Sequence, residues 1–482
     1  MSSSHVLPIA IFIVTLLATF GFAYLGRRHS TAAAESVLSE QKLNRWLVGL
    51  SAGATANSGF VVTGAVGLGY AYGLQWLMLP LSWLLGDAIF WWLFPQRINA
   101  LGLKTRATTL SDLLVADLPK KQNRILRRLI GLVIVLCLAG YVSAQWIAGE
   151  KFLAGAFDFS GFVALATFAV VITVYTAIGG FRGSVYVDSF QAVFRIFGTI
   201  LAVGAVALYA HFMGPSFWEN LSQAGPDFLA LLPGKSVVAA VGLILGFGFA
   251  ALGFGLGQPQ IVSRYLAGAT PQETRASWWI YIGFVQFTWI AMTIFGVILR
   301  GVVLDIDDPE QGLSLFFRHY MGPVLTGIIV ADIFATIAAT TNSLLVAVTQ
   351  TTLFDLVGVR SVSKNTMAIA SLVIGAITML VASFIGGNVV SLALSSVALV
   401  AAGLAPAVMC RVLGWRVTGP SIAAAVSVGL SVACAWKFAG WGGAVNEAAP
   451  GFVAGLLTNL LVARMTFGAS PESMGDRDGP TS

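Results

Sequence analysis

Oxygen-bearing side chains recur along one face of a hydrophobic segment in the second half of the chain. Asp332, Thr336 and Thr340 are four residues apart, so a helix would place them on one face. Asn342 and Ser343 follow about one turn further along. Oxygen ligands without sulfur or nitrogen suit a hard cation such as Na⁺. The alternative is hydrogen bonding between helices, and Asp332 could also relay protons.

Two more carboxylates lie inside apolar segments. Asp188 follows the glycines of YTAIGGFRGSVYVDSFQ, and Asp87 lies in an earlier segment with no evident partner. Carboxylates within a membrane are costly and are usually functional. For Asp188 the alternative is an ion pair with Arg195, which lies two turns along the same helical face.

The elements that position these residues follow from composition. The chain has 482 residues, of which 57% are hydrophobic and 10% charged, and its mean hydropathy is +0.85. Soluble domains are about 25% charged, and the longer apolar runs here approach the roughly 20 residues that cross a bilayer. The sequence therefore predicts an all-α polytopic membrane protein and excludes a soluble enzyme. About thirteen transmembrane helices are expected, at roughly 6–26, 46–72, 75–95, 128–157, 160–180, 185–211, 236–257, 278–300, 322–350, 366–387, 389–410, 417–437 and 449–467.

The distribution of basic residues predicts the topology. With the N-terminus outside and the C-terminus in the cytoplasm, most of the 27 Lys and Arg residues fall in cytoplasmic connections. The net charge of +6 thus reflects insertion into a plasma membrane (a bacterial inner membrane), and we expect no nucleic-acid partner. Lys151 is assigned no role. The outer-loop acids, which we expect to be a solvated surface, are Asp305, Asp307, Asp308 and Glu310.

Glycine concentrates in two segments, residues 49–69 and 242–257, and each opens a block of five expected spans. An odd number of spans per block inverts the second block relative to the first. Glycine-interrupted first helices in two inverted halves indicate a secondary-transporter binding site, because unwound carbonyls can bind a cation. Close helix packing is the alternative role of these glycines. The expected parts are a first helix and loop (1–45), two five-helix repeats (46–211 and 212–413), two C-terminal helices (414–467) and a disordered cytoplasmic tail (468–482).

Several stretches resemble the sodium/solute symporter family, which includes transporters of proline and pantothenate. They are SAGATANSG (51–59), YVSAQ (141–145), YTAIGGFRGSVYVDSFQ (175–191), GQPQIVSRYLA (257–267) and the Ser/Thr-rich segment around Thr340, in the family's order. The resemblance implies a LeuT-type fold with a five-plus-five inverted repeat. It also implies uptake by alternating access, with Na⁺ as the coupling ion.

The resemblance also implies positions for the binding sites. It places the main Na⁺ site at Ala54, Asn57, Thr336, Ala339 and Thr340. It sets Asp188, Asn342 and Ser343 where some members have a second cation site. The positions that it implies for the solute are Ser58, Phe60, Tyr141, Gln145, Phe254 and Gln258. From the residues alone, Tyr141 and Gln145 could equally form interhelical hydrogen bonds.

The sequence departs from the family's pattern at four positions. Ala339 lacks a hydroxyl that the family usually supplies, so Thr341 could substitute for it. Ala56 stands where the proline symporter has an aspartate, and Asp332 could supply that charge. Ala251 and Gly255 stand where aromatic residues line the proline pocket, which predicts a wider pocket.

We therefore predict an importer of a small polar organic solute, of the amino acid, carboxylate or vitamin type, driven by Na⁺ symport. The alternatives are a H⁺-coupled symporter that uses Asp332 and a non-transporting solute sensor of the same fold. No enzyme activity is expected, because the histidines all lie at span ends: His5, His29, His211 and His319. The sequence indicates neither the identity of the solute nor the oligomeric state.

Overall fold

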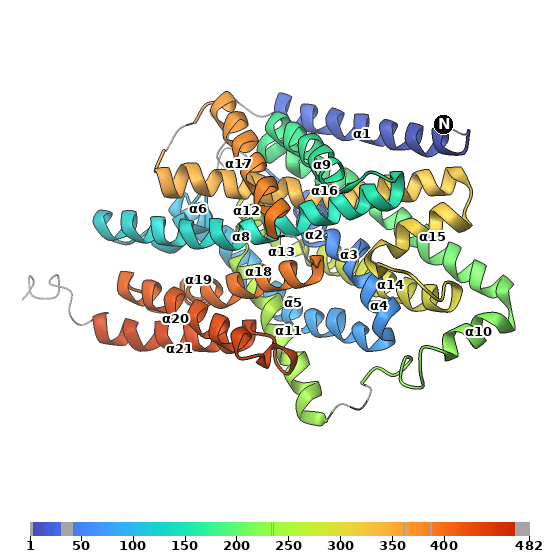
Figure 1. Ribbon diagram of the computed structural model, residues 1–482. Coiled ribbons are helices and arrows are strands. Elements are labelled where there is room, and N and C mark those ends of the chain that lie inside the picture. The colour runs from blue at the N-terminus through green and yellow to red at the C-terminus, as the bar shows by residue number, and fades with distance from the viewer. Residues whose placement is uncertain are drawn as a thin grey trace, which may run out of the picture.

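The computed structural model describes residues 3–29, 42–232, 234, 236–359, 362–385 and 388–467. Its named elements are all helical, and most long helices run side by side in one direction (Figure 1). α1 (Ser3–His29) begins at the right-hand end of the bundle in this view, and α21 (Ala448–Phe467) ends at the left-hand end. The expected tail at 468–482 lies outside the described residues.

Within the described residues, ten helices are long and apolar enough to cross a membrane. An eleventh is the bent pair α18 (Val389–Gly403) and α19 (Ala405–Val412), which meet at 45°. The expected count of thirteen is larger because two of the ten each contain two expected spans. α9 (Gly161–Met213) has 53 residues and breaks at Gly180, where φ is 58°. At 1.5 Å per residue it would be about 80 Å long, far more than the roughly 30 Å of a bilayer core.

The second double run covers Gly59–Leu93. It includes a turn at Gly73 (φ 78°), the 3₁₀ turn η2 (Gly73–Leu77) and α5 (Met78–Leu93). The helix before this run is α2 (Arg45–Ala56), and the helix after it is α6 (Pro95–Thr105). Both contact the same short helix, α13 (Pro271–Ala276). The chain therefore crosses the bundle before Gly73 and returns through α5.

Both glycine-rich segments are broken helices, as predicted. The first comprises α2 (Arg45–Ala56), α3 (Gly59–Val62) and α4 (Gly64–Tyr72), with Asn57 and Ser58 between α2 and α3. The second comprises α11 (Val237–Gly257) and α12 (Pro259–Leu266), with Gln258 between them. The next residue, Pro259, has no backbone N–H and cannot continue the helical hydrogen bonds, so α11 ends before it.

Some of these glycines also serve close packing. A Cβ atom on Gly69 would lie 2.3 Å from the carbonyl oxygen of Thr293, on α14 (Trp278–Val302). One on Gly296 would lie 2.1 Å from the carbonyl oxygen of Val66. The backbones of α4 and α14 therefore touch, and both proposed roles of glycine are present in one segment.

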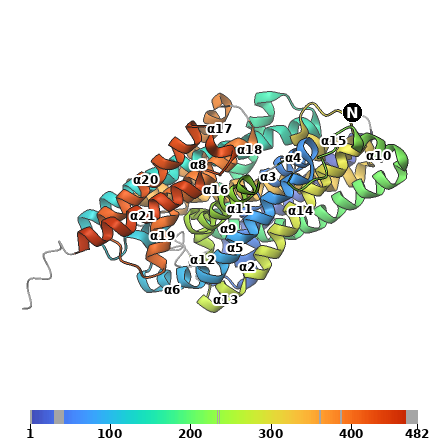
Figure 2. The same cartoon turned by 90° about the horizontal axis from the view of Figure 1, so that it is seen from below.

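α16 (Pro323–Gln350) runs through the centre and is buried at every position after Ile329. It contacts α1, α2, α8 (Lys120–Phe157) and α9, and the π-helical turn η4 (Thr351–Val357) follows it. α20 (Gly419–Phe438) and α21 pack together at one edge of the bundle (Figure 2). The remaining elements are α7 (Leu110–Val115), α10 (Pro215–Ser222), η3 (Pro309–Gln311), α15 (Gly312–Tyr320), α17 (Lys364–Ile385) and η5 (Trp441–Gly443).

The expectation that the outer acids are only a solvated surface is wrong for two of them. The Lys151 ammonium lies 2.9 Å from Asp308 Oδ2 and 2.5 Å from Glu310 Oε2. Lys151, to which the sequence analysis assigned no role, thus links α8 to the segment before α15 through these two ion pairs.

Candidate functional site

The break after α2 releases backbone carbonyls from the helix. The amide of Ser58 donates to Ala56 O (3.0 Å), and the amide of Gly59 donates to Gln145 Oε1 (2.9 Å). In a continuous helix these two amides would bond the carbonyls of Ala54 and Thr55. Two carbonyls deep in the bundle are therefore available to another partner.

That partner is Thr340 on α16. Its Oγ1 donates to Thr55 O at 2.9 Å and lies 3.4 Å from Ala54 O. The structure thus brings Thr340 and Ala54 together. The Thr341 hydroxyl donates to Ile337 O in its own helix (2.7 Å), so Thr341 does not take the place that Ala339 leaves without a hydroxyl.

The other residues predicted for this site are also buried here. The carbonyl of Asn57 lacks its helical donor, because the amide of Val61 donates to Ser58 O (2.9 Å). The Asn57 side chain donates to Thr288 Oγ1 (2.7 Å). Ala339 is buried, and the Thr336 hydroxyl donates within α16 to the carbonyl of Asp332 (2.9 Å).

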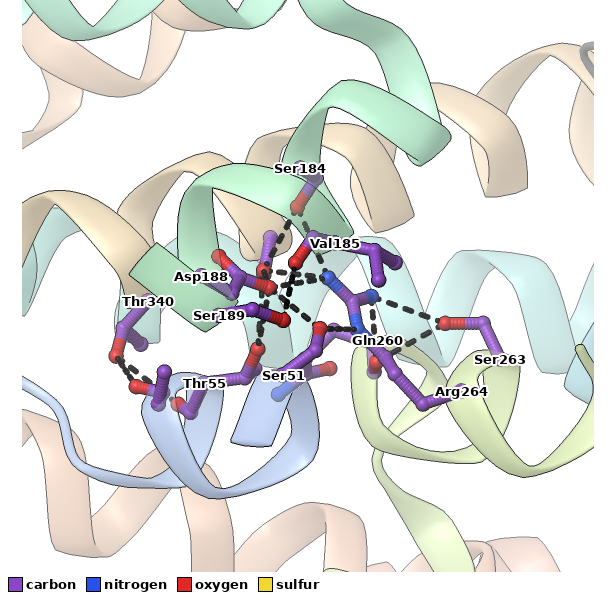
Figure 3. Close-up of polar contacts among 12 residues, drawn as sticks. Ser51, Thr55, Ser184, Val185, Asp188, Ser189, Gln260, Ser263, Arg264 and Thr340 are labelled. Carbon is purple, nitrogen blue, oxygen red and sulfur yellow. Dashed lines mark hydrogen bonds and ion pairs between the residues drawn. The ribbon is translucent and has the colours of Figure 1, made fainter. Parts of the chain in front are cut away.

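Asp188 lies at the centre of a second cluster (Figure 3). Its Oδ2 accepts hydrogen bonds from Ser51 (2.7 Å) and Ser343 (3.2 Å) and lies 3.3 Å from Thr55 Oγ1. Its Oδ1 is buried without a partner. Thr55 joins the two clusters, because its carbonyl faces Thr340 while its hydroxyl is 3.0 Å from Ser343 Oγ.

The ion-pair partner of Asp188 is Arg264, so the alternative pairing with Arg195 is wrong. Arg264 Nη2 lies 3.0 Å from Asp188 Oδ2, 2.7 Å from Ser343 Oγ and 2.9 Å from Ser184 Oγ. The arginine is fully buried, although its place in the sequence suggested a cytoplasmic connection. It occupies the centre of the oxygen cluster where a second cation was expected.

Arg195 pairs instead with Asp332, and both side chains are buried. The pair joins the second half of α9 to α16. The Asp332 charge is neutralised by this arginine and lies outside the Asp188 cluster. Asn342, also predicted for a second cation site, is not in that cluster either, and both polar atoms of its amide are buried without a partner.

The residues predicted to contact the solute surround the two helix breaks. The rings of Phe60 and Trp289 lie 5.5 Å apart, those of Trp289 and Trp83 5.2 Å, and those of Trp83 and Phe254 5.6 Å. The Tyr141 hydroxyl faces the hydroxyl of Ser58.

Within the described ranges, several polar atoms of the residues around the helix breaks are buried without a hydrogen-bond partner. They are the Nε1 atoms of Trp83 and Trp289, the Nε2 atoms of Gln145 and Gln258, and Oδ1 of Asn57. Because buried polar groups in folded proteins are usually paired, such a concentration of unpaired groups is typical of a ligand site.

The expected widening of the pocket at Ala251 and Gly255 is wrong. A Cβ atom on Gly255 would lie 2.6 Å from the Phe90 ring, and one on Gly86 would lie 2.6 Å from the Cβ of Ala251. α5 therefore fills the space that the missing aromatic side chains leave on α11.

Sequence reasoning did not identify six residues of these clusters: Ser51, Thr55, Trp83, Ser184, Arg264 and Trp289. Ser51 and Thr55 are four residues apart in a glycine-rich segment, which was a usable signal. Arg264 lies in the family-like stretch 257–267, but it was not assigned to a site because a basic residue after a span resembles a topology determinant.

Comparisons with known proteins agree with this architecture. Residues 37–429 match the sodium:solute symporter family. Among curated proteins, the chain is 26% identical to the sodium/proline symporter of Escherichia coli, covering 92% of this chain and 90% of the relative. It is 25% identical to the osmoregulated proline transporter OpuE of Bacillus subtilis (97% and 96% covered). It is 24% identical to the sodium/pantothenate symporter of Haemophilus influenzae (72% and 70% covered).

Among solved structures, a Na⁺-coupled sialic acid symporter in a substrate-bound outward-open state superposes with a TM-score of 0.76 at 16% identity. The match covers 95% of this chain and 98% of the other. At this identity the likeness shows the fold, which is the LeuT type with two inverted repeats. The family match covers most of the sequence, and the curated relatives above are transporters rather than enzymes. The chain belongs to the sodium:solute symporter family and is a Na⁺-coupled secondary transporter of small solutes.

Proposed function

We propose that this transporter imports a small polar organic solute together with Na⁺ by alternating access. The observation that carries the proposal is the pair of released carbonyls, Ala54 and Thr55, opposite the Thr340 hydroxyl. Carbonyl and hydroxyl oxygens at the interface of two repeats can replace the hydration shell of a hard cation. The repeats would be residues 46–211 and 212–413, as the sequence predicts.

In this proposal the main Na⁺ site consists of Ala54, Asn57, Thr336, Ala339 and Thr340. The first two contribute carbonyls from the break, and Thr340 contributes its hydroxyl. When Na⁺ binds, the Thr340 hydroxyl would turn its lone pairs toward the ion and give up its hydrogen bond to Thr55. Because Ala339 supplies no hydroxyl, backbone oxygen would have to complete the coordination there.

A second cation could use Asp188, Ser343 and, after a rotation of its side chain, Asn342. The guanidinium of Arg264 contacts the first two of these residues. We propose that Arg264 and a second cation exclude each other. In the described conformation the arginine would supply the positive charge that the carboxylate requires.

The solute would bind among Ser58, Phe60, Tyr141, Gln145, Phe254 and Gln258, with Trp83 and Trp289 completing the aromatic part of the site. Their unpaired amide and indole N–H groups could donate to oxygen atoms of the solute. The rings would bury its apolar part.

For orientation we propose the N-terminus outside and the C-terminus in the cytoplasm of a bacterial plasma membrane, on the basis of the distribution of Lys and Arg. One positive charge moved inward through 100 mV contributes about 2.3 kcal/mol. That energy sustains a solute gradient of roughly fifty-fold, because about 1.4 kcal/mol corresponds to a factor of ten.

The test is solute uptake into proteoliposomes under an imposed Na⁺ gradient or a pH gradient alone. The panel includes L-proline, pantothenate and N-acetylneuraminate. We expect concentrative uptake of at least one solute only with Na⁺, and little uptake by the Thr340→Ala variant at the same Na⁺ concentration. Equal uptake with a pH gradient alone would contradict the proposal.

A further inference from the structure

We propose that Asp87 binds a positively charged amine of the transported solute, so that this chain carries solutes with a protonated or quaternary ammonium group. The inference rests on the proposed function and adds the chemical class of the solute. Asp87 lies on α5, and its side chain is buried, with 1% of the residue exposed.

Asp87 differs from the other two buried carboxylates described above, because it has no arginine partner among the residues that the structure describes. Asp188 pairs with Arg264 and Asp332 pairs with Arg195. The Oδ2 atom of Asp87 is buried with no hydrogen-bond partner, and no Lys or Arg in the described ranges forms an ion pair with it.

Neither α11 nor α14, as far as the described residues show, pairs a basic side chain with Asp87. α11, which packs along α5, carries no charged residue. The single basic residue of α14 is Arg300 near its end, and that guanidinium donates to the carbonyl of Leu304 (2.8 Å). An unpaired carboxylate in such surroundings is costly. A cationic ligand would offset that cost.

Aromatic residues lie on the same face of α5 as Asp87. Trp83 and Trp91 lie one turn before and one turn after Asp87, and both are buried. The Trp91 ring packs 5.4 Å from Tyr265 and 5.1 Å from Tyr281. Ring faces attract ammonium groups, and one carboxylate among several rings is a suitable site for them.

The same surroundings disfavour a metal cation. A hard cation needs several oxygen ligands, whereas the residues one turn before and one turn after Asp87 are tryptophans, whose side chains supply no oxygen. The Nε1 atoms of Trp83 and Trp91 are buried and lack acceptors. They could donate to an oxygen of an organic solute but would repel a metal ion. Trp83 also contacts Phe254 and Trp289, so this site is continuous with the proposed solute site.

The close packing of α5 on α11 positions the carboxylate. A Cβ atom on Gly86, the preceding residue, would lie 2.1 Å from the carbonyl oxygen of Gly248. Asp87 is therefore held against the broken helix of the second repeat, where a solute would bind between the repeats.

The test measures thermal stabilisation of the purified full-length protein, in buffer containing Na⁺, by L-proline, glycine betaine, choline, pantothenate, N-acetylneuraminate and D-glucose. We expect stabilisation by at least one solute with an ammonium group. Asp87→Asn should raise the half-saturating concentration of that solute about ten- to a hundred-fold, as expected for the loss of a charge-assisted hydrogen bond. Asp87→Glu should retain part of the affinity.

A matched pair of tryptophans serves as a control. Trp91→Phe should weaken binding of the amine, whereas Trp92→Phe should not, because Trp92 is 75% exposed on the outer face of the same helix. Stabilisation of wild type only by anionic or neutral solutes would overturn the proposal, and so would unchanged amine affinity in Asp87→Asn.

Stabilisation by Na⁺ alone separates this inference from the proposed function. Asp87→Asn should keep the Na⁺-dependent shift in melting temperature, because Asp87 is not part of the proposed Na⁺ site. If Na⁺ stabilises the protein but no amine does, or Asp87→Asn leaves the amine affinity unchanged, only the role of Asp87 in amine binding is wrong. If Na⁺ stabilises neither protein, the proposed Na⁺ site itself is wrong.

Discussion

Asp188 and Arg264 form an ion pair, with Oδ2 and Nη2 3.0 Å apart and both side chains buried. The carboxylate lies on α9, after the break at Gly180, and the guanidinium lies on α12, after the break at Gln258. The pair thus links α9 to the second of the two broken helices (Figure 3). Thr55 connects the pair to Thr340, so a change in the pair should alter the Na⁺ affinity of the proposed site.

Asp188→Asn should raise the Na⁺ concentration for half-maximal uptake about tenfold, because the unpaired Arg264 charge would repel Na⁺ nearby. The measurement is the Na⁺ dependence of uptake in proteoliposomes. The double variant Asp188→Asn/Arg264→Gln removes both charges and should recover much of the loss. An unchanged Na⁺ dependence in the single variant would make Asp188 a structural partner of Arg264 only.

Thr340→Ala should raise the half-saturating Na⁺ concentration about tenfold, because it removes the hydroxyl that faces Ala54 and Thr55. Thr341→Ala is the matched control, since its hydroxyl bonds within α16 and the change should have little effect. Thermal stabilisation by Na⁺, measured without solute, reports the affinity directly. A larger effect at Thr341 would shift the site by one residue.

Asp332→Asn should destabilise the protein by about 3–5 kcal/mol, because it leaves Arg195 buried without a counter-charge. Arg195→Gln should act similarly, and the double variant should be more stable than either single one. The measurement is thermal unfolding in detergent with and without Na⁺. Stability equal to wild type combined with loss of Na⁺-dependent uptake would instead assign Asp332 to coupling.

Gly296→Ala should destabilise the bundle by about 1–3 kcal/mol, because the new methyl group would lie 2.1 Å from Val66 O and force α4 and α14 apart. Gly283→Ala on the same helix meets nothing within 4 Å and serves as the control. It should be neutral or slightly stabilising, since alanine is the better helix former. Equal melting temperatures of the two variants would contradict close packing at Gly296.

Much of the architecture could be predicted from the sequence because it depends on local properties. Apolar runs of bilayer length predict helices, and the two glycine-rich runs predict that two of them are broken. The grouping of Thr340 with Ala54 could be inferred from the family resemblance. Whether Thr341 supplies the hydroxyl that Ala339 lacks could not be inferred, because adjacent residues point about 100° apart and only the packing of α16 decides which side chains face α2.

Ion-pair partners could not be predicted, because they depend on which helices face each other. Asp188 and Arg195 share a helical face, but seven residues correspond to about 10 Å along the helix axis. Each therefore pairs with a closer residue on another element, Arg264 or Asp332.

The size of the pocket likewise could not be read from Ala251 and Gly255. Phe90, distant in sequence, fills the space beside Gly255. The sequence by itself determined a membrane bundle with two broken helices, because hydropathy and chain breaks are local properties. Only the tertiary structure decided which buried acids pair with arginine and that, among the described residues, Asp87 has no such partner, because those outcomes depend on contacts between distant segments.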